Sequence, residues 1–272
     1  MSWRASETVA GTAASAGWLV PAEAGKVLHL ERQLQQEEIP VTDLVNYQLE
    51  DGVATITISN GKANALSHEV FEALGLAFDR AEEDKAVVIL TGQPGILSGG
   101  YDLKEMQKGP KEASALVTVG SRFTRRLAAF PLPVIAACSG HAIAKGAFVL
   151  LSVDYRIGIE GDFKLGLNEV AIGMTMHHAG IEIARHRLSP AHFYRSVVNA
   201  EIFSPEGAVQ AGFLDEVVAP DRLMKRANEL AQQFRKLNMK AHEQTKRKAK
   251  AGYLELLDDC ILKDAENLGL TG

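Results

Sequence analysis

The sequence predicts an α/β domain built from repeated strand and helix units, and three observations point to it. Short apolar runs with the length of buried strands alternate with longer stretches of helical periodicity. Short loops join them, which is typical of α/β folds with parallel strands. The composition, 46% hydrophobic and 23% charged over 272 residues, is that of a globular protein able to bury one large core.

The chain divides into three parts by composition. Residues 1–40 are first rich in Ala, Gly and Ser and then helix-like, and we interpret them as an N-terminal extension that is either flexible or not native. Residues 41–220 hold the alternating strands and helices, whereas residues 221–272 are helical and rich in Lys, Arg, Glu and Gln. Small residues near Ala24 imitate a secretory signal, but Glu7 and the weak apolar segment argue against export.

Each predicted element has its own pattern. Residues 41–59 predict two strands joined at Asp51-Gly52, a hairpin signal. The segment 65–84 predicts a helix with Ser67 as its N-cap and with one apolar face. The later elements follow in order: a strand at 86–92, a helix at 112–130, a strand at 132–140, a helix from 145 and a strand at 154–160.

Charge and cysteine usage exclude several classes of protein. The net charge of −5 gives no general attraction to nucleic acid or to an anionic membrane. Polar residues interrupt the longest apolar stretch, 134–151, so no segment predicts a membrane span. Cys138 and Cys260 lack metal-ligand spacing and predict reduced thiols, so we expect a cytoplasmic protein without a metal.

Two loops have the features of a reactive site. In 92–106 a buried strand ends, and Gly99 and Gly100 allow a tight turn before Tyr101. In 139–151 another buried strand ends and a helix begins, so backbone N–H groups meet the positive end of a helix. Two such donors converging on one point form an oxyanion hole. The alternative is that both glycine turns serve packing alone.

Five segments carry a family resemblance through their order and separation. They are GKANALS (61–67), LSGGYDL (97–103), SGHAIAKGA (139–147), GLNEVAIGM (166–174) and FSPEGAVQAGFLDEVV (203–218). Because of them, residues 41–272 resemble the crotonase (enoyl-CoA hydratase/isomerase) superfamily. The resemblance implies a spiral of β/β/α units and a C-terminal helical region that builds homotrimers, often paired into hexamers. It also implies an acyl-CoA substrate, of which coenzyme A is a part, and no separate cofactor.

The resemblance implies roles for the loop residues. The backbone N–H groups of Tyr101 and Lys145 would polarise the thioester carbonyl. The loop around Ala63 would grip the adenine end of coenzyme A, largely through its backbone, and Asp102 would brace the turn beside it. The residues that match the family's substrate-binding loops are Lys62, Ala63, Ala65, Gly100 and Asp102.

The resemblance also separates two reactions. Hydratases of the family use two glutamates to activate water and transfer protons. One of them matches Glu169, but Phe148 stands in the place of the other and can neither accept a proton nor hold a water. Glu169 alone suits an isomerisation, in which one base moves a proton from the α- to the γ-carbon while the oxyanion hole holds the dienolate. Hydration with a non-standard partner for Glu169, decarboxylation and thioester hydrolysis stay open.

Three further side chains have open roles in the acyl pocket. Lys145 stands where the family usually has glycine, and its ammonium is expected either to reach solvent along its own stem or to approach enolate or phosphate charge. His177 is a candidate for lining the pocket or assisting protonation. The ring of Tyr101 is expected to narrow the pocket.

The basic run 246–250 has three interpretations. It is an RNA-binding footprint, which the acidic chain disfavours, or a solvated face of a helix. The third interpretation places Lys246 against the phosphates of coenzyme A as a point charge. A non-catalytic or RNA-binding crotonase-like protein is thus the alternative from another functional class.

Overall fold

The computed structural model describes residues 43–266, so the extension predicted over residues 1–40 lies outside the described residues. The strands form two sheets. The larger sheet has the order β1 (Val45–Glu50), β2 (Val53–Ile58), β3 (Val87–Thr91), β5 (Val134–Ala137), β7 (Tyr155–Ile159) and β10 (Glu216–Val218). The smaller sheet has the order β4 (Gly95–Ser98), β6 (Gly140–Ile143), β8 (Leu165–Gly166) and β9 (Ile202–Phe203).

Successive strands enter the two sheets in turn. β3, β5 and β7 lie parallel in the larger sheet, and β4, β6 and β8, which follow them along the chain, lie parallel in the smaller one. Helices come after these pairs: α3 (Leu103–Met106) and α4 (Pro110–Ala129) follow β4, α5 (Lys145–Ser152) follows β6, and α6 (His178–Arg187) follows β8. The repeat confirms the predicted β/β/α units. Only the family resemblance implied the second strand of each unit; local patterns do not indicate the smaller sheet, because its strands are too short for a periodic signal.

The predicted hairpin and first helix are both present. β1 and β2 pair antiparallel around Asp51 and Gly52, whose φ angles of 45° and 68° are the left-handed values that such a turn requires. α2 (His68–Glu83) begins after Ser67, whose side chain accepts a hydrogen bond from the Val70 N–H.

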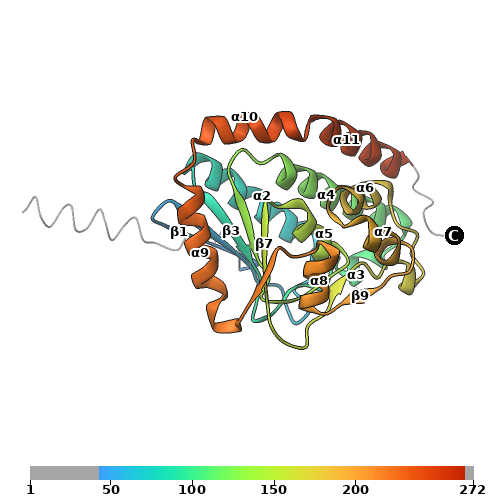
Figure 1. Cartoon of the computed structure of the whole chain (residues 1–272). Helices are drawn as coiled ribbons and strands as arrows, with labels where there is room; N and C mark the ends of the chain where they lie inside the picture. Colours follow the sequence, from blue (N-terminus) through green and yellow to red (C-terminus); the bar gives the residue numbers. More distant parts are fainter. Residues whose placement is uncertain (1–42, 267–272) are drawn as a thin grey trace, which may run out of the picture. The chain divides into compact units, whose positions relative to one another are not determined.

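Both faces of the larger sheet are covered, and this explains its apolar strands. On β3, Val88 and Leu90 join the core beneath α2, α4 and α5, whereas Val87 and Ile89 join a second core beneath α9 (Leu223–Phe234). Figure 1 shows α9 on the opposite side of the sheet from the other three helices. A strand buried on both faces is hydrophobic at every position, as the 86–92 run predicts.

The C-terminal helices continue from α9 and return over the helical layer. α10 (Met239–Ala249) and α11 (Ala251–Glu266) run along one side of the domain, and α11 packs against α4 and α6 (Figure 1). The remaining helical elements are η1 (Val170–Ile172), α7 (Pro190–Val197), α8 (Pro205–Ala211) and η2 (Pro220–Arg222). Between residues 43 and 266, no helix combines the length and apolarity needed to span a bilayer.

Candidate active site

The backbone amides of Tyr101 and Lys145 lie close together, after β4 and β6, which are neighbouring strands of the smaller sheet. The Leu66 N–H donates to the Gly100 carbonyl at 2.8 Å, and the Asp102 N–H donates to the Leu66 carbonyl at 3.1 Å. Tyr101 lies between these bonded positions, so its own N–H points away from Leu66. A Cβ on Gly100 would lie 3.5 Å from the Lys145 nitrogen, so the two turns are in contact. In the described part of the chain, neither the Tyr101 N–H nor the Lys145 N–H donates to a protein acceptor.

A strained turn places the second amide. Ala144 has φ 51° and ψ −120°, a conformation that favours glycine, and for another residue it costs about 1–3 kcal/mol. The Ala144 N–H donates to the Gly166 carbonyl at 3.0 Å, and the Ala144 carbonyl accepts from the Phe148 N–H at 3.1 Å. The turn therefore begins α5 and at the same time ties it to the loop that carries Glu169.

Glu169 is a buried carboxyl group on a fixed backbone. Its carbonyl accepts from the N–H groups of Ile172 and Met174 at 3.2 and 2.9 Å, which closes the turn at η1. The side chain is 7% exposed, and its Oε2 has no hydrogen-bond partner. Burial raises the pKa of Glu169 to about 7, and the positive charge of Lys145 partly opposes this shift. Both protonation states are therefore accessible near neutral pH.

Phe148 and His177 pack against each other beside the Lys145 ammonium. The Phe148 ring is fully buried and meets the His177 ring edge-on, with 5.4 Å between the ring centroids. Gly180 makes room for both, because a Cβ there would lie 2.6 Å from His177 Cε1 and 2.9 Å from Phe148 Cζ. Burial lowers the pKa of His177 to about 3, so the imidazole is neutral, and its Nε2 is buried without a partner.

The side chain of Lys145 does not reach solvent, so that expectation is wrong. It is 0% exposed, and its Nζ donates to Thr124 Oγ1 on α4 at 3.1 Å. The ammonium lies 5.7 Å from the centre of the Tyr101 ring and 5.8 Å from that of Phe148. The stem runs from α5 toward α4, against which α5 packs. Burial lowers the pKa of Lys145 to about 7, and Glu169 opposes this shift.

The Tyr101 ring fills the space beside α4. Its hydroxyl donates to the Val117 carbonyl at 3.3 Å, and a Cβ on Gly120 would lie 2.5 Å from the hydroxyl oxygen. Gly120 therefore makes the room that the ring occupies. That the Tyr101 ring narrows the acyl pocket stays a prediction.

The loop predicted to hold coenzyme A is shaped by a residue that sequence reasoning missed. Asn64 is buried with φ 46°, and its side-chain amide donates to the carbonyls of Ile58 and Leu97 at 3.0 and 2.8 Å. These bonds leave Lys62 and Ala63 exposed at the surface and Ala65 half-buried. The signal was the asparagine itself, which tolerates left-handed backbone better than most residues. The role of the loop in binding adenine stays a prediction.

Two aspartates hold backbone amides around the site. Asp102 caps α3 by accepting from the N–H groups of Lys104 and Glu105 at 2.7 and 3.2 Å, in keeping with the bracing role expected of it. Asp264, near the end of α11, is 4% exposed and accepts from the N–H groups of His178 and Ala179. It thereby holds α11 against the start of α6, beside His177. Nothing in the sequence indicated Asp264, because its partners lie 86 and 85 residues away along the chain.

Comparison with known proteins decides the family. The model of the family described as enoyl-CoA hydratase/isomerase matches residues 48–270. The chain belongs to the enoyl-CoA hydratase/isomerase family. A "probable enoyl-CoA hydratase" of Bacillus subtilis is 31% identical over 196 residues, covering 70% of this chain and 75% of the relative.

Solved structures of the enoyl-CoA hydratase/isomerase family share the fold. A family protein from Pseudomonas syringae is 56% identical with a TM-score of 0.83, covering 84% of this chain and 99% of that one. A Mycobacterium tuberculosis protein described as an enoyl-CoA isomerase is 37% identical with a TM-score of 0.79, covering 83% of this chain and 99% of that one. Relatives of both descriptions thus resemble this chain.

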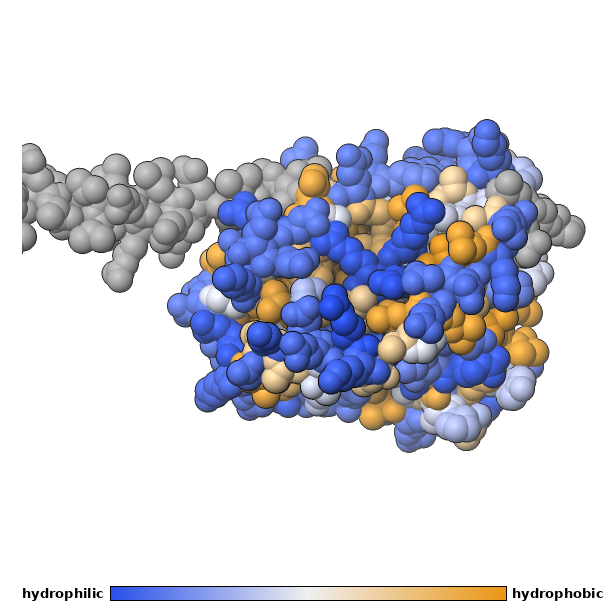
Figure 2. Space-filling model, turned by 90° about the horizontal axis from the view of Figure 1, so that it is seen from above, coloured by the Kyte–Doolittle hydropathy of each residue, from blue (hydrophilic) through white to orange (hydrophobic). Residues whose placement is uncertain are grey.

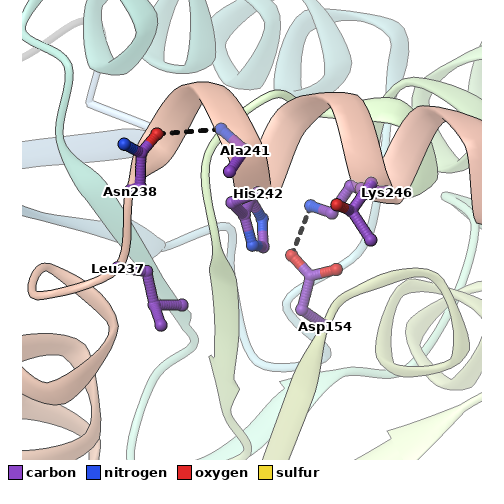
Figure 3. Close-up of a pocket in the computed structure, with 7 residues that line it drawn as sticks. Asp154, Leu237, Asn238, Ala241, His242 and Lys246 are labelled. Atoms are coloured by element: carbon purple, nitrogen blue, oxygen red, sulfur yellow. Dashed lines mark hydrogen bonds and ion pairs between the residues drawn. The ribbon is translucent and has the colours of Figure 1, made fainter.

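Lys246 was expected to contact the phosphates of coenzyme A, but its ammonium is already bound within the protein. Its Nζ lies 2.5 Å from Asp154 Oδ2 and donates to the carbonyls of Phe130 and Leu132 at 2.8 and 3.2 Å. All three ammonium hydrogens are thereby used, and the residue is 8% exposed. Figure 3 shows the pair beneath α10, at a groove of about 450 Å³. The expectation fails because α10 packs its basic run partly inward.

The same packing weakens the RNA-binding interpretation. Lys250, in the same run, also turns toward Asp154 and donates to the Ala128 carbonyl at 3.1 Å. Figure 2 looks onto the side of α10 and α11, where hydrophilic residues alternate with exposed apolar ones. Two of the cations that a nucleic acid would need are therefore engaged within the protein.

Replacing Lys246 by methionine is expected to lower the free energy of unfolding by about 3 kcal/mol, since Asp154 keeps only the more distant Lys250 as a counter-charge and the carbonyls of Phe130 and Leu132 lose their donor. The measurement is the midpoint of urea unfolding. Lys248→Met, an exposed neighbour on the same helix, is the control and should leave the midpoint unchanged. Equal midpoints for the two variants would show that the Lys246–Asp154 pair adds nothing to stability.

Proposed function

We propose that this enoyl-CoA hydratase/isomerase family member catalyses the conversion of 3-enoyl-CoA into 2-enoyl-CoA, with Glu169 as the group that moves the proton. One observation carries the proposal. Glu169 is a buried carboxyl group with a pKa raised to about 7, so it can both accept and return a proton. Phe148 stands where the family resemblance implies a second carboxylate in hydratases. The two free amides of Tyr101 and Lys145 supply the electrostatic part of the site.

The reaction follows from these groups. The thioester oxygen accepts hydrogen bonds from the Tyr101 and Lys145 N–H groups, and the Glu169 carboxylate removes a proton from the α-carbon. Negative charge spreads over the dienolate that forms. Each N–H donor to its oxygen typically contributes a factor of about 10²–10³ to kcat. The protonated Glu169 then returns the proton to the γ-carbon, so the double bond moves without any change in atoms or oxidation state. A base with a pKa near 7 serves both steps.

The chemistry needs protons and no electron transfer, so the proposal includes no metal and no cofactor besides the coenzyme A of the substrate. A homotrimer or hexamer and a cytoplasmic location belong to the same proposal. They are supported by the resemblance of the C-terminal helices and by the reduced thiols of Cys138 and Cys260.

Hydration is the second candidate, and His177 supports it. Its Nε2 is buried beside Phe148 without a partner, so a water bound there would meet a neutral imidazole rather than a second carboxylate. Such an imidazole can hold a water, but with a pKa of about 3 it does not serve as a general acid at neutral pH. Isomerisation needs no such partner.

The test is incubation of the protein with matched panels of 2-enoyl-CoA and 3-enoyl-CoA esters, followed by identification of the products. We expect isomerisation of the 3-enoyl esters to be faster than hydration of the 2-enoyl esters. Faster hydration would favour the second candidate. Inertness toward both panels would favour a non-catalytic protein.

The pH dependence of isomerisation is expected to report Glu169. Only the carboxylate form accepts the α-proton, so kcat/KM should fall as the pH drops through about 7 and level off above it. Two titratable groups interact electrostatically with Glu169: Lys145 on α5 and Tyr101 before α3. Since the Lys145 ammonium favours the carboxylate, Lys145→Met should move the falling limb to higher pH. A profile that is flat through pH 7 contradicts the assignment.

A further inference from the structure

The ammonium of Lys145 is buried with too few partners. It is 0% exposed, and Thr124 Oγ1 supplies its one hydrogen bond within residues 43–266, although an ammonium has three donors. The rings of Tyr101 and Phe148 flank it, and it forms no ion pair with any described carboxylate. A buried charge with unsatisfied donors is costly unless a partner arrives from outside the chain.

Two other buried polar atoms without a partner lie within the electrostatic influence of the Lys145 ammonium. The His177 imidazole contacts Phe148 from another side, and its Nε2 is buried without a partner, as is Oε2 of Glu169. The positive charge of Lys145 is close enough to influence both Glu169 and His177. A purely hydrocarbon acyl group bound here would leave the Lys145 and His177 groups unsatisfied, and each such group costs about 1–3 kcal/mol.

We propose that the acyl group of the substrate carries a carboxylate, which pairs with the Lys145 ammonium and accepts further hydrogen bonds beside it. This inference rests on the proposed acyl-CoA function and specifies its substrate class: short acyl-CoA esters with a second, free carboxyl group. A carboxylate supplies both the opposite charge and the acceptors that Thr124 alone does not provide.

The position of Lys145 limits the length of this acyl group. The N–H of Lys145 is one of the two donors to the thioester oxygen, and its Nζ would bind the far carboxylate. One residue would thus hold both ends of the acyl group, so their separation cannot exceed the reach of a single lysine side chain. The carboxylate is therefore only a few bonds from the thioester carbon.

Glu169 does not take the place of this carboxylate. It forms no ion pair with Lys145, and its Oε2 is left free. In the proposed reaction Glu169 must accept a proton from the α-carbon, so a second carboxylate beside Lys145 lets Glu169 keep that task.

Binding of unreactive esters tests the inference without turnover. Three pairs differ only in a terminal methyl or carboxylate group: butyryl- and succinyl-CoA, pentanoyl- and glutaryl-CoA, and hexanoyl- and adipoyl-CoA. For at least one pair, titration calorimetry should show the carboxylated ester binding about tenfold or more tightly, as for a hydrogen bond to a charged group. Lys145→Met, which keeps the backbone donor and the stem, should abolish or reverse this preference, whereas the exposed Lys164→Met should retain it.

A second readout is specific to the charge. Burial lowers the pKa of Lys145 to about 7, and an anion beside it raises that pKa again. Binding of the carboxylated ester at pH 8 should therefore take up a proton, seen as a dependence of the binding enthalpy on the ionisation enthalpy of the buffer. The CoA ester that ends in a methyl group should take up none, and neither ester should do so in Lys145→Met.

The outcomes separate this inference from the proposed reaction. Equal affinities within every pair, or a preference that survives in Lys145→Met, overturn the inference. Isomerisation is judged independently with 3-hexenoyl-CoA and 3-hexenedioyl-CoA. If the wild type isomerises neither ester but shows the binding preference, the proposed reaction fails and the carboxylate site stands. Failure of every ester to bind overturns both.

Discussion

Glu169→Gln is expected to slow exchange of the α-proton of acyl-CoA by about 10²- to 10⁴-fold, the usual contribution of a positioned acid or base. Glutamine keeps the shape of the side chain and loses only the capacity to carry the proton. The dissociation constant for the acyl-CoA ester should stay nearly unchanged, because the oxyanion donors belong to the backbone of Tyr101 and Lys145. Exchange is followed by deuterium incorporation from heavy water, and affinity by calorimetry.

The matched control is Glu160→Gln, an exposed glutamate just after β7 that has no part in the site. It should exchange the α-proton at the wild-type rate. If Glu169→Gln retains that rate as well, another group carries the proton, and His177 is the first to examine because of its free Nε2.

Phe148→Glu is the second substitution with a large expected effect. It places a carboxyl group where the resemblance implies the second glutamate of a hydratase, and hydration of 2-enoyl-CoA should rise from its wild-type level. The stability cost should be high, about 3–5 kcal/mol, because the ring is fully buried and packs against His177 and Gly180. Burial beside Glu169 also favours the protonated form of the new acid, which limits the gain in hydration.

Phe148→Gln separates the two effects. This variant also loses the phenyl ring, and its glutamine side chain has the size of glutamate. The amide cannot transfer a proton. Both variants should unfold at lower urea concentration than the wild type, and only Phe148→Glu should gain hydration. An equal gain in both would mean that room for water, and not a second acid, limits hydration in the wild type.

Local patterns in the sequence account for most of the backbone. The hairpin at Asp51-Gly52, the cap at Ser67 and the apolar strand at 86–92 each depend on neighbouring residues, and all three are present. The two loops with free amides follow from the same reasoning, since a strand ends and glycine or a helix begins. The smaller sheet was missed because pairing between strands of two to four residues is decided by segments distant in the chain.

The site could be located from sequence only in part. The segments around Tyr101, Lys145 and Glu169 were recognisable, and in the structure the Lys145 ammonium lies beside the Tyr101 ring and its charge influences Glu169. The loop residue Asn64 and the buried Asp264 were missed, since their roles depend on partners such as Leu97 and His178. Such partners are visible only when the chain is folded.

The sequence by itself determined the order of strands and helices, the two amide-bearing turns and the family. Only the tertiary structure decided where the long charged side chains end. Lys145 and Lys246 were both expected near solvent or phosphate, yet Lys145 ends against Thr124 and Lys246 against Asp154. The physical reason is that a lysine stem can turn either way at little local cost. Its direction is set by packing between elements that are separate in the chain.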